Sequence, residues 1–178
     1  VDGLCVAHLG KEGEGTIVAY DLVTGDQKWK WTGDGPAYSS PVLMKVEDTK
    51  QLVVHTEKNL VGIAVADGNL LWQVPTPTQR RFYNSATPIV NGQTVIYTGQ
   101  GSGTKAVKVV KQDDGFATKE LWSNEELGTG FNTPVLKNNL LFGLSKNSNL
   151  FCIYAQNGRT AWTDTTKREN FGSIVDAG

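Results

Sequence analysis

The sequence is poor in several features that mark common kinds of site. Its 178 residues include only two cysteines, two histidines and one methionine. The longest apolar runs, such as 52–54, fall far short of the ~20 residues that span a bilayer. Seventeen Lys and Arg residues oppose 18 Asp and Glu residues, so the formal net charge is −1. This balance lacks the basic excess that predicts a nucleic-acid partner, and we expect no nucleic acid and no membrane span.

Cysteine and histidine are too few to predict a metal or redox site. Cys5 and Cys152 each lie in a short apolar run, which predicts two buried thiols. A disulfide between them would require the two ends of the chain to meet. His8 and His55 have no cysteine or carboxylate at metal-ligand spacing. We therefore expect surface or strand-end histidines and no metal site.

A repeat centred on tryptophan is the strongest signal in the sequence. A glycine stands four positions before a tryptophan three times, at Gly25–Trp29, Gly68–Trp72 and Gly158–Trp162. A looser copy, with an insertion, runs from Gly115 to Trp122. Dipeptides such as Asp67-Gly68 are typical of tight hairpin turns, because glycine accepts the positive φ that these turns require.

A second marker has the same period. A hydroxyl residue, a proline and a β-branched residue follow one another at 40–42, 87–89 and 133–135. These prolines are 47 and 46 residues apart, and successive repeat tryptophans are 43, 50 and 40 residues apart. Two independent markers in step at about 45 residues indicate a true structural repeat.

Each repeat contains four short apolar runs separated by turns, and no window has the spacing of an amphipathic helix. Four strands in about 45 residues indicate one blade of a β-propeller. The predicted fold is therefore all-β, with antiparallel four-stranded blades. In such a blade each tryptophan would lie on the outer part and pack against the neighbouring blade.

The markers divide the chain into three complete blades and two partial ones within a single propeller domain. The predicted boundaries are a partial blade at 1–35, complete blades at 36–77, 78–124 and 125–166, and the start of a next blade at 167–178. Alternatively, the chain closes on itself as four blades, with 173–178 supplying the first strand of the blade that begins at Val1.

The stretch from Ala19 to Trp29 resembles the pyrroloquinoline-quinone-type (PQQ-like) propeller repeat, in which Ala-x-Asp-x-x-Thr-Gly-x-x-x-Trp closes each blade. More divergent copies carry Gly62, Ala64, Asp67, Gly68 and Trp72, and Cys152, Tyr154, Asn157, Gly158 and Trp162. The resemblance implies a ring of seven or eight blades, of which this chain is about half. It also implies a periplasmic or otherwise extracytoplasmic location in a bacterium. The family includes quinone-dependent alcohol dehydrogenases, an outer-membrane assembly lipoprotein and many propellers without an assigned activity.

The segments that lead into the proline-marked strands hold the candidate site residues. They carry Tyr38 and Ser39, then Arg81, Tyr83 and Asn84, then Phe131 and Asn132, and finally Arg168 and Asn170. Because the first strand of a blade lines the central channel, these side chains are expected to converge at one mouth of it. The functional interpretation is a polar, aromatic ligand site with Arg81 and Arg168 as anion contacts. The alternative is that the polar residues cap turns and the aromatic residues pack between blades.

Two functions remain open. The favoured one is a non-catalytic scaffold that binds a protein or a small ligand at the channel mouth, beside the remaining blades of the ring. The other is part of a PQQ- and calcium-dependent alcohol dehydrogenase. The resemblance implies that such enzymes hold the quinone with an adjacent cysteine pair and a stacking tryptophan, and calcium with acid and amide ligands. The sequence has no Cys-Cys pair, and the blade motif accounts for its tryptophans. We therefore expect no catalytic residue and no cofactor in this chain.

Overall fold

The computed structural model describes residues 1–78, 83–166, 168 and 172–177. Every regular element in these residues is a β-strand, and the strands form four antiparallel sheets. The first sheet has three strands: β1 (Leu4–Lys11), β2 (Glu14–Asp21) and β3 (Gln27–Gly33). The second has four: β4 (Val42–Val46), β5 (Thr49–His55), β6 (Asn59–Ala64) and β7 (Leu70–Pro75). The predicted all-β propeller architecture is confirmed.

The other two sheets repeat the same order of strands. The third contains β8 (Ile89–Asn91), β9 (Thr94–Gly99), β10 (Gly103–Gln112) and β11 (Gly115–Asn124). The fourth contains β12 (Val135–Lys137), β13 (Leu140–Leu144), β14 (Leu150–Tyr154) and β15 (Thr160–Asp164). In each sheet consecutive strands are hydrogen-bonded neighbours, so every sheet is an up-and-down meander. Each sheet lies inside one of the predicted repeats.

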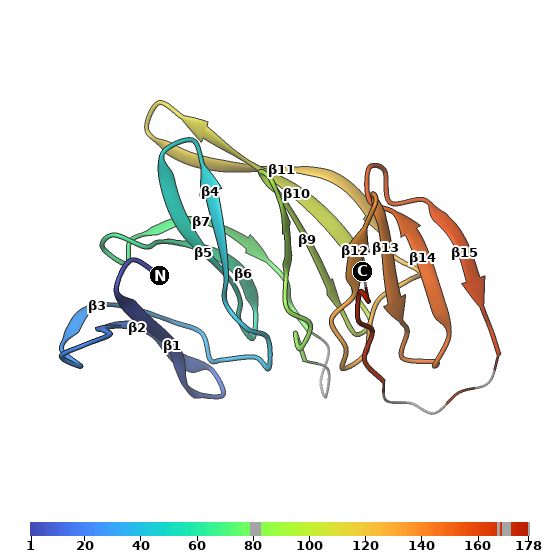
Figure 1. The fold of residues 1–178 in the computed structure, drawn as a ribbon, viewed down its shortest axis with the longest axis horizontal. Helices are drawn as coiled ribbons and strands as arrows, with labels where there is room; N and C mark the ends of the chain where they lie inside the picture. The colour runs from blue at the N-terminus through green and yellow to red at the C-terminus, as the bar shows by residue number, and fades with distance from the viewer. Residues whose placement is uncertain (79–82, 167, 169–171, 178) are drawn as a thin grey trace.

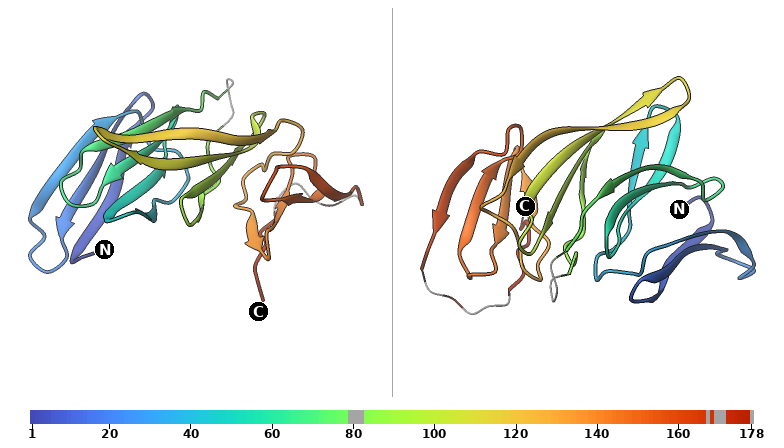
Figure 2. Two further views of the ribbon diagram at one scale, coloured as in Figure 1. Left: turned by 90° about the horizontal axis from the view of Figure 1, so that it is seen from above. Right: turned by 180° about the vertical axis from the view of Figure 1, so that it is seen from behind.

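The four sheets follow one another in a row, from β1–β3 at one end to β12–β15 at the other (Figures 1 and 2). The N-terminus lies beside the first sheet, whereas residues 174–177 line a cavity on the fourth sheet. The chain therefore does not close on itself as four blades. Residues 172–177 form no hydrogen-bonded strand within the described chain, so the start of a next blade stays a prediction.

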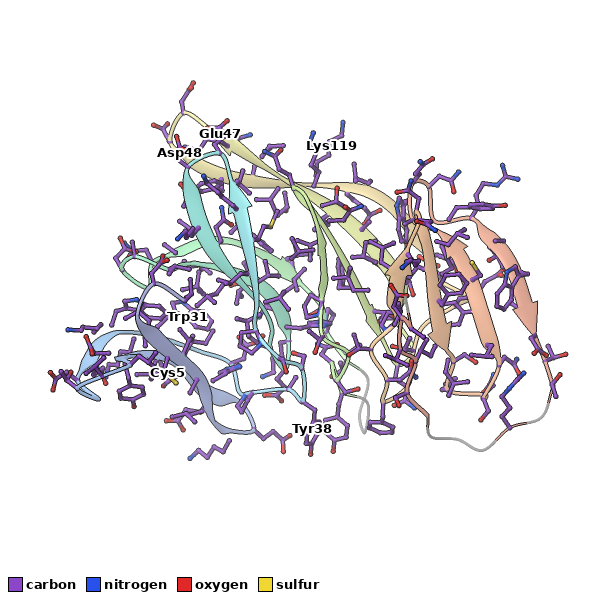
Figure 3. All side chains as sticks on the ribbon, viewed as in Figure 1. Cys5, Trp31, Tyr38, Glu47, Asp48 and Lys119 are labelled. Atoms are coloured by element: carbon purple, nitrogen blue, oxygen red, sulfur yellow. The ribbon has the colours of Figure 1, made fainter. Side chains whose placement is uncertain are left out.

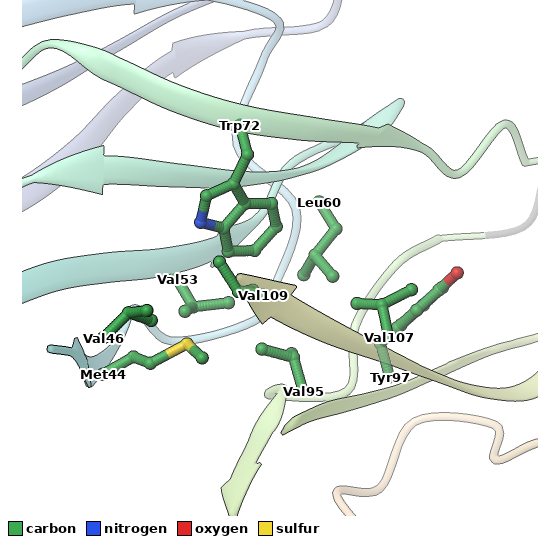
Figure 4. Packing of buried hydrophobic residues seen from close by; sticks show 9 residues of the cluster. All are labelled: Met44, Val46, Val53, Leu60, Trp72, Val95, Tyr97, Val107 and Val109. Carbon is green, nitrogen blue, oxygen red and sulfur yellow. The ribbon is translucent and has the colours of Figure 1, made fainter. Parts of the chain in front are cut away.

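Apolar side chains fill each of the three interfaces between neighbouring sheets. One cluster joins the first and second sheets, a second joins the second and third, and a third joins the third and fourth. In the middle interface Met44, Val53 and Trp72 pack against Val95 and Val109 (Figure 4). Strands such as β6 are buried on both faces, which is why their sequences do not alternate between apolar and polar residues.

Two of the repeat tryptophans lie across these interfaces in the same way. The indole ring covers the turn glycine of the next sheet, and the indole N–H donates to the carbonyl three residues before that glycine, at 2.9 Å in both cases. The two sets are Trp29 with Val65 and Gly68, and Trp122 with Ala155 and Gly158.

The other two repeat tryptophans differ from this pattern. Trp72 is buried in the middle interface, but its indole N–H donates to Gln51 Oε1 of its own sheet at 2.6 Å. In the third sheet, the turn equivalent to those at Gly68 and Gly158 contains Gly115, at the tip of the long β10–β11 hairpin. No atom lies within 4 Å of a Cβ added at Gly115, so Trp72 does not cover this turn. Trp162, in the last sheet, is 46% exposed. It contacts the ring of Phe142 in its own sheet at a centroid distance of 6.1 Å.

Cys152 is buried as predicted, but the prediction of a buried Cys5 is wrong, because Cys5 is exposed (Figure 3). Cys5 corresponds in strand position to Leu52 and Leu141, which both pack against the preceding sheet. No sheet of the described chain precedes the first one, so the same position is open to solvent.

Candidate binding surface

Four segments connect the last strand of one sheet to the first strand of the next, or continue beyond the last sheet. We call the edge that they form, comprising the described residues of 34–41, 76–88, 125–134 and 165–172, the linker edge. It lies along the lower side of the molecule in Figure 1, together with the β1–β2 turn. All the predicted channel-mouth residues belong to this edge, except that Arg81 and Asn170 lie outside the described residues.

Ser39 and Asn132 hold the backbone of their own sheets. Ser39 Oγ donates to the carbonyl of His55 at 2.7 Å. Asn132 Nδ2 donates to the carbonyl of Leu144 at 2.7 Å, and its Oδ1 accepts from the Leu144 N–H at 3.2 Å. Both sites thus pin the linker to the last residue of the second strand. These two polar groups serve the turns, as the alternative interpretation states.

Asn84 has the same structural role with different partners. It is 1% exposed, and its Nδ2 lies 3.0–3.1 Å from the carbonyl oxygens of Thr56, Glu57 and Thr76. Thr56 and Glu57 lie in the β5–β6 turn and Thr76 directly follows β7, so Asn84 ties its linker to the end of the second sheet. Its side chain is therefore not available to a ligand at the surface.

The aromatic side chains of the same segments remain at the surface. Tyr38 is 76% exposed, Phe131 is 55% exposed and Tyr83 is 46% exposed. Tyr38 and Tyr83 come from successive linkers and contact each other edge to face, with their ring centroids 5.5 Å apart. Tyr38 lies at the lower rim of the molecule (Figure 3). The structure thus brings two of the predicted aromatic residues together and places the third on the same edge.

Arg168, the described member of the predicted pair of anion contacts, already has a carboxylate partner. Its guanidinium forms an ion pair with Asp164 Oδ2 and donates to the carbonyl of Thr166 at 2.9 Å. The hydrogen bond from Arg168 holds the pKa of Asp164 well below its ordinary value. The positive charge of Arg168 is therefore neutralised within its own segment.

A series of hydroxyl residues crosses the linker edge, and its hydrogen bonds could not be predicted from the sequence. Its members are Ser40, Thr87 and Thr133, which directly precede the three marker prolines. The Ser40 N–H donates to Thr87 Oγ1 at 3.1 Å, and the Thr87 N–H donates to Thr133 Oγ1 at 3.0 Å. The hydroxyls of Thr87 and Thr133 thus each accept from the equivalent residue of the preceding sheet. The marker encodes a contact between sheets, as well as a strand start.

Asp34 braces the first linker against the β5–β6 turn. Its carboxylate accepts hydrogen bonds from the Thr56 hydroxyl, from the Lys58 N–H at 3.0 Å and from Asn59 Nδ2 at 3.1 Å. Burial raises the pKa of Asp34, but the three hydrogen-bond donors outweigh it, so its pKa is lowered overall. The carboxylate therefore stays ionised, which suits a permanent brace.

His55 lies beneath the linker edge, where it is buried and ends strand β5, so of the two expected positions, surface or strand end, it takes the strand end. Its Nε2 lies 3.2 Å from Thr76 Oγ1, and its ring contacts Tyr97 edge to face. Burial lowers the pKa of His55 to about 4. Its side chain is therefore neutral near pH 7 and part of the core.

Among the described residues, no group of three or more His, Cys, Asp or Glu side chains is placed to hold a metal ion. The indole rings of Trp29, Trp72 and Trp122 are buried within the interfaces between sheets, whereas Trp162 is 46% exposed. Within the described part of the chain, no helix is long and apolar enough to cross a membrane.

Four-stranded antiparallel meanders, joined in a row through linkers along one edge, define a β-propeller protein. The model of one propeller family, described as outer membrane protein assembly factor BamB, matches residues 2–164. The chain belongs to this family, and the resemblance to PQQ-like repeats is thereby confirmed.

One designed protein of known structure shares the fold. The computationally designed protein Ika8 matches with a TM-score of 0.66 at 10% identity, over 97% of this chain and 53% of that one. BamB from Moraxella catarrhalis matches with a TM-score of 0.42 at 14% identity, over 91% of this chain and 58% of that one. The chain thus spans little more than half the length of either structure. No curated protein matches the chain.

Proposed function

We propose that this chain is a non-catalytic binding module of an extracytoplasmic propeller, and that the exposed aromatic residues of the linker edge contact a protein partner. The observation that carries the proposal is the set of three exposed rings, Tyr38, Tyr83 and Phe131, on one braced edge. The proposal requires no cofactor and no metal ion.

The chemistry of the edge suits a protein partner. Tyrosine and phenylalanine are enriched at protein interfaces, because each buries a large area with few rotatable bonds. The backbone that carries the rings is fixed by Ser39, Asn84 and Asn132, which reduces the entropy lost on binding. The edge is less suited to binding a small anionic ligand, because the described arginine of this edge, Arg168, already forms an ion pair with Asp164.

Family membership supports the location and the kind of partner. The matched family is described as an outer membrane protein assembly factor. We extend that description to this chain as an extracytoplasmic scaffold that holds another protein, together with any further blades of its ring.

Site-specific photo-cross-linking tests this function. A benzophenone amino acid replaces Tyr38, Tyr83 or Tyr154 in turn, and the protein is irradiated with envelope proteins of the source bacterium. Tyr154 is the control, because it is 49% exposed but lies at the far end of β14, near the β14–β15 turn. We expect the first two positions to give the same discrete adduct and Tyr154 to give none.

A second variant makes the result specific. Tyr38→Ala, combined with the cross-linker at Tyr83, is expected to reduce the adduct about fivefold, the effect of losing about 1 kcal/mol of contact. Equal adducts at all three positions, or none at the linker edge, would contradict the proposal.

A further inference from the structure

Two exposed tyrosines of the linker edge form a pair whose geometry is set by the fold. Tyr38 and Tyr83 contact each other edge to face, with their ring centroids 5.5 Å apart and an angle of 79° between the ring planes. Tyr38 lies in the linker between β3 and β4, and Tyr83 lies in the linker between β7 and β8. Both linkers join sheets that the structure describes, so the pair is an internal feature of the row of sheets.

The residue that follows each tyrosine is fixed to the same part of the second sheet. Ser39 Oγ donates to the carbonyl of His55 at 2.7 Å. Asn84 Nδ2 lies 3.0 Å from the carbonyl oxygen of Thr56 and 3.1 Å from that of Glu57. The three acceptors are consecutive residues at the end of β5 and in the turn that follows it. The two rings are therefore held side by side through one short stretch of backbone.

The pair offers open ring faces and open hydroxyl groups. In an edge-to-face pair each ring keeps at least one face that the other does not cover, and the two ring planes meet as a corner. Tyr38 is 76% exposed and Tyr83 is 46% exposed. Among the described residues, neither hydroxyl group has a hydrogen-bond partner. The pair is therefore able to pack against an apolar ring and to donate two hydrogen bonds beside it.

The backbone of the linker edge is not available to an added β-strand. Strand addition requires a row of free N–H and C=O groups at the edge of a sheet. Here Pro36, Pro41 and Pro88 have no N–H group. The N–H groups of Ser40 and Thr87 already donate to hydroxyl groups of the linkers that follow. A partner segment must therefore bind through side chains, in a conformation that needs no backbone ladder.

The surroundings of the pair do not suit an acidic or phosphorylated segment. Such segments are bound by clusters of basic side chains. Neither 35–41 nor 83–88 contains a charged residue. Arg168, the described arginine of the linker edge, is already paired with Asp164. The chemistry that remains at the pair is uncharged and consists of two aromatic rings and two hydroxyl donors.

An amphipathic helix is unsuited for a different reason. Such a helix lays its apolar face into a hydrophobic groove, which holds it from both sides. Tyr38 instead stands out from the lower rim of the molecule (Figure 3), and most of its surface is exposed. The rings thus form a ridge, and a ridge suits a narrow, extended segment that packs along it.

A polyproline II segment matches this chemistry. It is an extended helix without internal hydrogen bonds, so its carbonyl groups accept from donors outside the segment. Its proline rings are rigid and apolar, and they dock on aromatic side chains at a low cost in entropy. A proline ring in the corner between Tyr38 and Tyr83 would contact the face of one ring and the edge of the other. The tyrosine hydroxyl groups would then donate to carbonyl groups of the segment.

We propose that the Tyr38–Tyr83 pair binds a proline-rich segment of the protein partner in the polyproline II conformation. The proposal rests on the function proposed above, because it names the chemistry of the partner at the same edge. Phe131 stands two residues before its marker hydroxyl, as Tyr38 does, and is 55% exposed. It extends the aromatic surface of the linker edge for a longer segment.

Nuclear magnetic resonance of the protein with labelled tyrosine tests this site directly. The chain has five tyrosines, and substitution by phenylalanine assigns each ring signal. The probe is a blocked peptide of ten prolines, and the control is a blocked glycine–serine peptide of the same length. We expect decaproline to shift the signals of Tyr38 and Tyr83 and to leave that of Tyr154 unchanged, because Tyr154 lies at the far end of β14. Equal shifts with the control peptide, or none with decaproline, would overturn the proposal.

Variants separate the role of the ring from that of its hydroxyl group. In the same titration, Tyr38→Ala is expected to weaken decaproline binding at least about fivefold. Tyr38→Phe is expected to weaken it about threefold, because the ring stays and one donor is lost. Tyr154→Ala removes another exposed tyrosine and should leave binding unchanged. Circular dichroism should be the same in all three variants, because both side chains are exposed. Equal weakening in Tyr38→Ala and Tyr154→Ala would contradict the site.

The cross-linked partner separates this proposal from the proposed function. We expect the segment captured at Tyr38 and Tyr83 to contain at least two prolines within about six residues, which is two turns of the helix. A discrete adduct whose captured segment contains no proline would overturn the polyproline assignment and leave the proposed function standing. An acidic peptide of ten residues that binds more tightly than decaproline would overturn the assignment as well.

Discussion

At the scale of single residues, the linker edge separates groups that hold the fold from groups that face solvent. Ser39, Asn84 and Asn132 look like ligand contacts in the sequence, but their partners are backbone atoms of the sheets. These partners lie 8 to 28 residues away along the chain. A local pattern does not encode such distant partners. The sequence therefore predicted which residues lie on the linker edge, and not whether their side chains turn toward the sheets or toward solvent. The exposed rings of Tyr38 and Phe131 could be predicted no better, because aromatic residues pack as readily as they bind.

The buried His55 gives the chain a pH-dependent stability. Its pKa is about 6.5 when the chain is unfolded and about 4 when it is folded. Between these values the unfolded state binds more protons, so the free energy of unfolding should fall as the pH drops from 6.5 to 4. The expected loss is up to about 3 kcal/mol. Urea unfolding of the wild type and of His55→Leu across this range measures it.

Two checks make this prediction specific. The pKa of His8 is also lowered, chiefly by burial, so His8→Gln serves as the matched control that should keep most of the slope. The lowered carboxylates, Asp21, Asp34 and Asp164, titrate below their ordinary value of 3.8 and act at lower pH. The same slope in His55→Leu and in the wild type would show that this residue is not the cause.

At the scale of elements, one long hairpin changes the tryptophan contact of the third repeat. Gly115 precedes Trp122 by seven positions instead of four. The added length carries the turn away from Trp72, and the hairpin instead lies over the second sheet, where Phe116 packs on the middle cluster. Trp72 consequently donates to Gln51. The looser spacing was visible in the sequence, but the new hydrogen-bond partner of Trp72 was not, because it depends on how the hairpin folds back.

The contact between tryptophan and turn glycine should be sensitive to a single methyl group. Gly158 has a φ of +72°, and an added Cβ would lie 2.5 Å from Trp122 Cε3. Gly158→Ala is therefore expected to cost about 2–4 kcal/mol, from backbone strain together with displacement of the ring. Gly92→Ala is the control, because its φ is also positive but no atom lies within 4 Å of the added methyl group. Its expected cost is about 1–2 kcal/mol. Urea unfolding compares the two, and equal losses would argue against the packing role of Trp122.

At the scale of the whole molecule, periodicity alone predicted the architecture. Two markers in step placed every sheet within its repeat, because each blade must present the same edge and the same faces to its neighbours. What periodicity could not predict was the state of the two ends. The exposure of Cys5 and Trp162 follows from missing neighbours, and the sequence of the positions themselves resembles that of buried equivalents.

The row of sheets should be most stable in its middle. Leu60, Val61 and Ile63 of β6 are fully buried between sheets, whereas β1 has no buried residue. We therefore expect the amides of β6 to exchange with solvent slowest and those of β1 fastest. Hydrogen exchange followed by mass spectrometry measures this order. Uniform protection from β1 to β15 would indicate that the row unfolds as one unit.

The interface between sheets also bears on how such chains change length over evolution. Trp72 is the repeat tryptophan whose following turn, at Gly115, cannot receive it. Losing the unit 78–124 from the gene would place Trp72 before the turn at Gly158, which is a working acceptor for Trp122. Duplicating the unit 125–166 would likewise set Trp162 before a copy of that turn. We therefore expect the loss or duplication of a whole unit to preserve this contact between tryptophan and turn glycine.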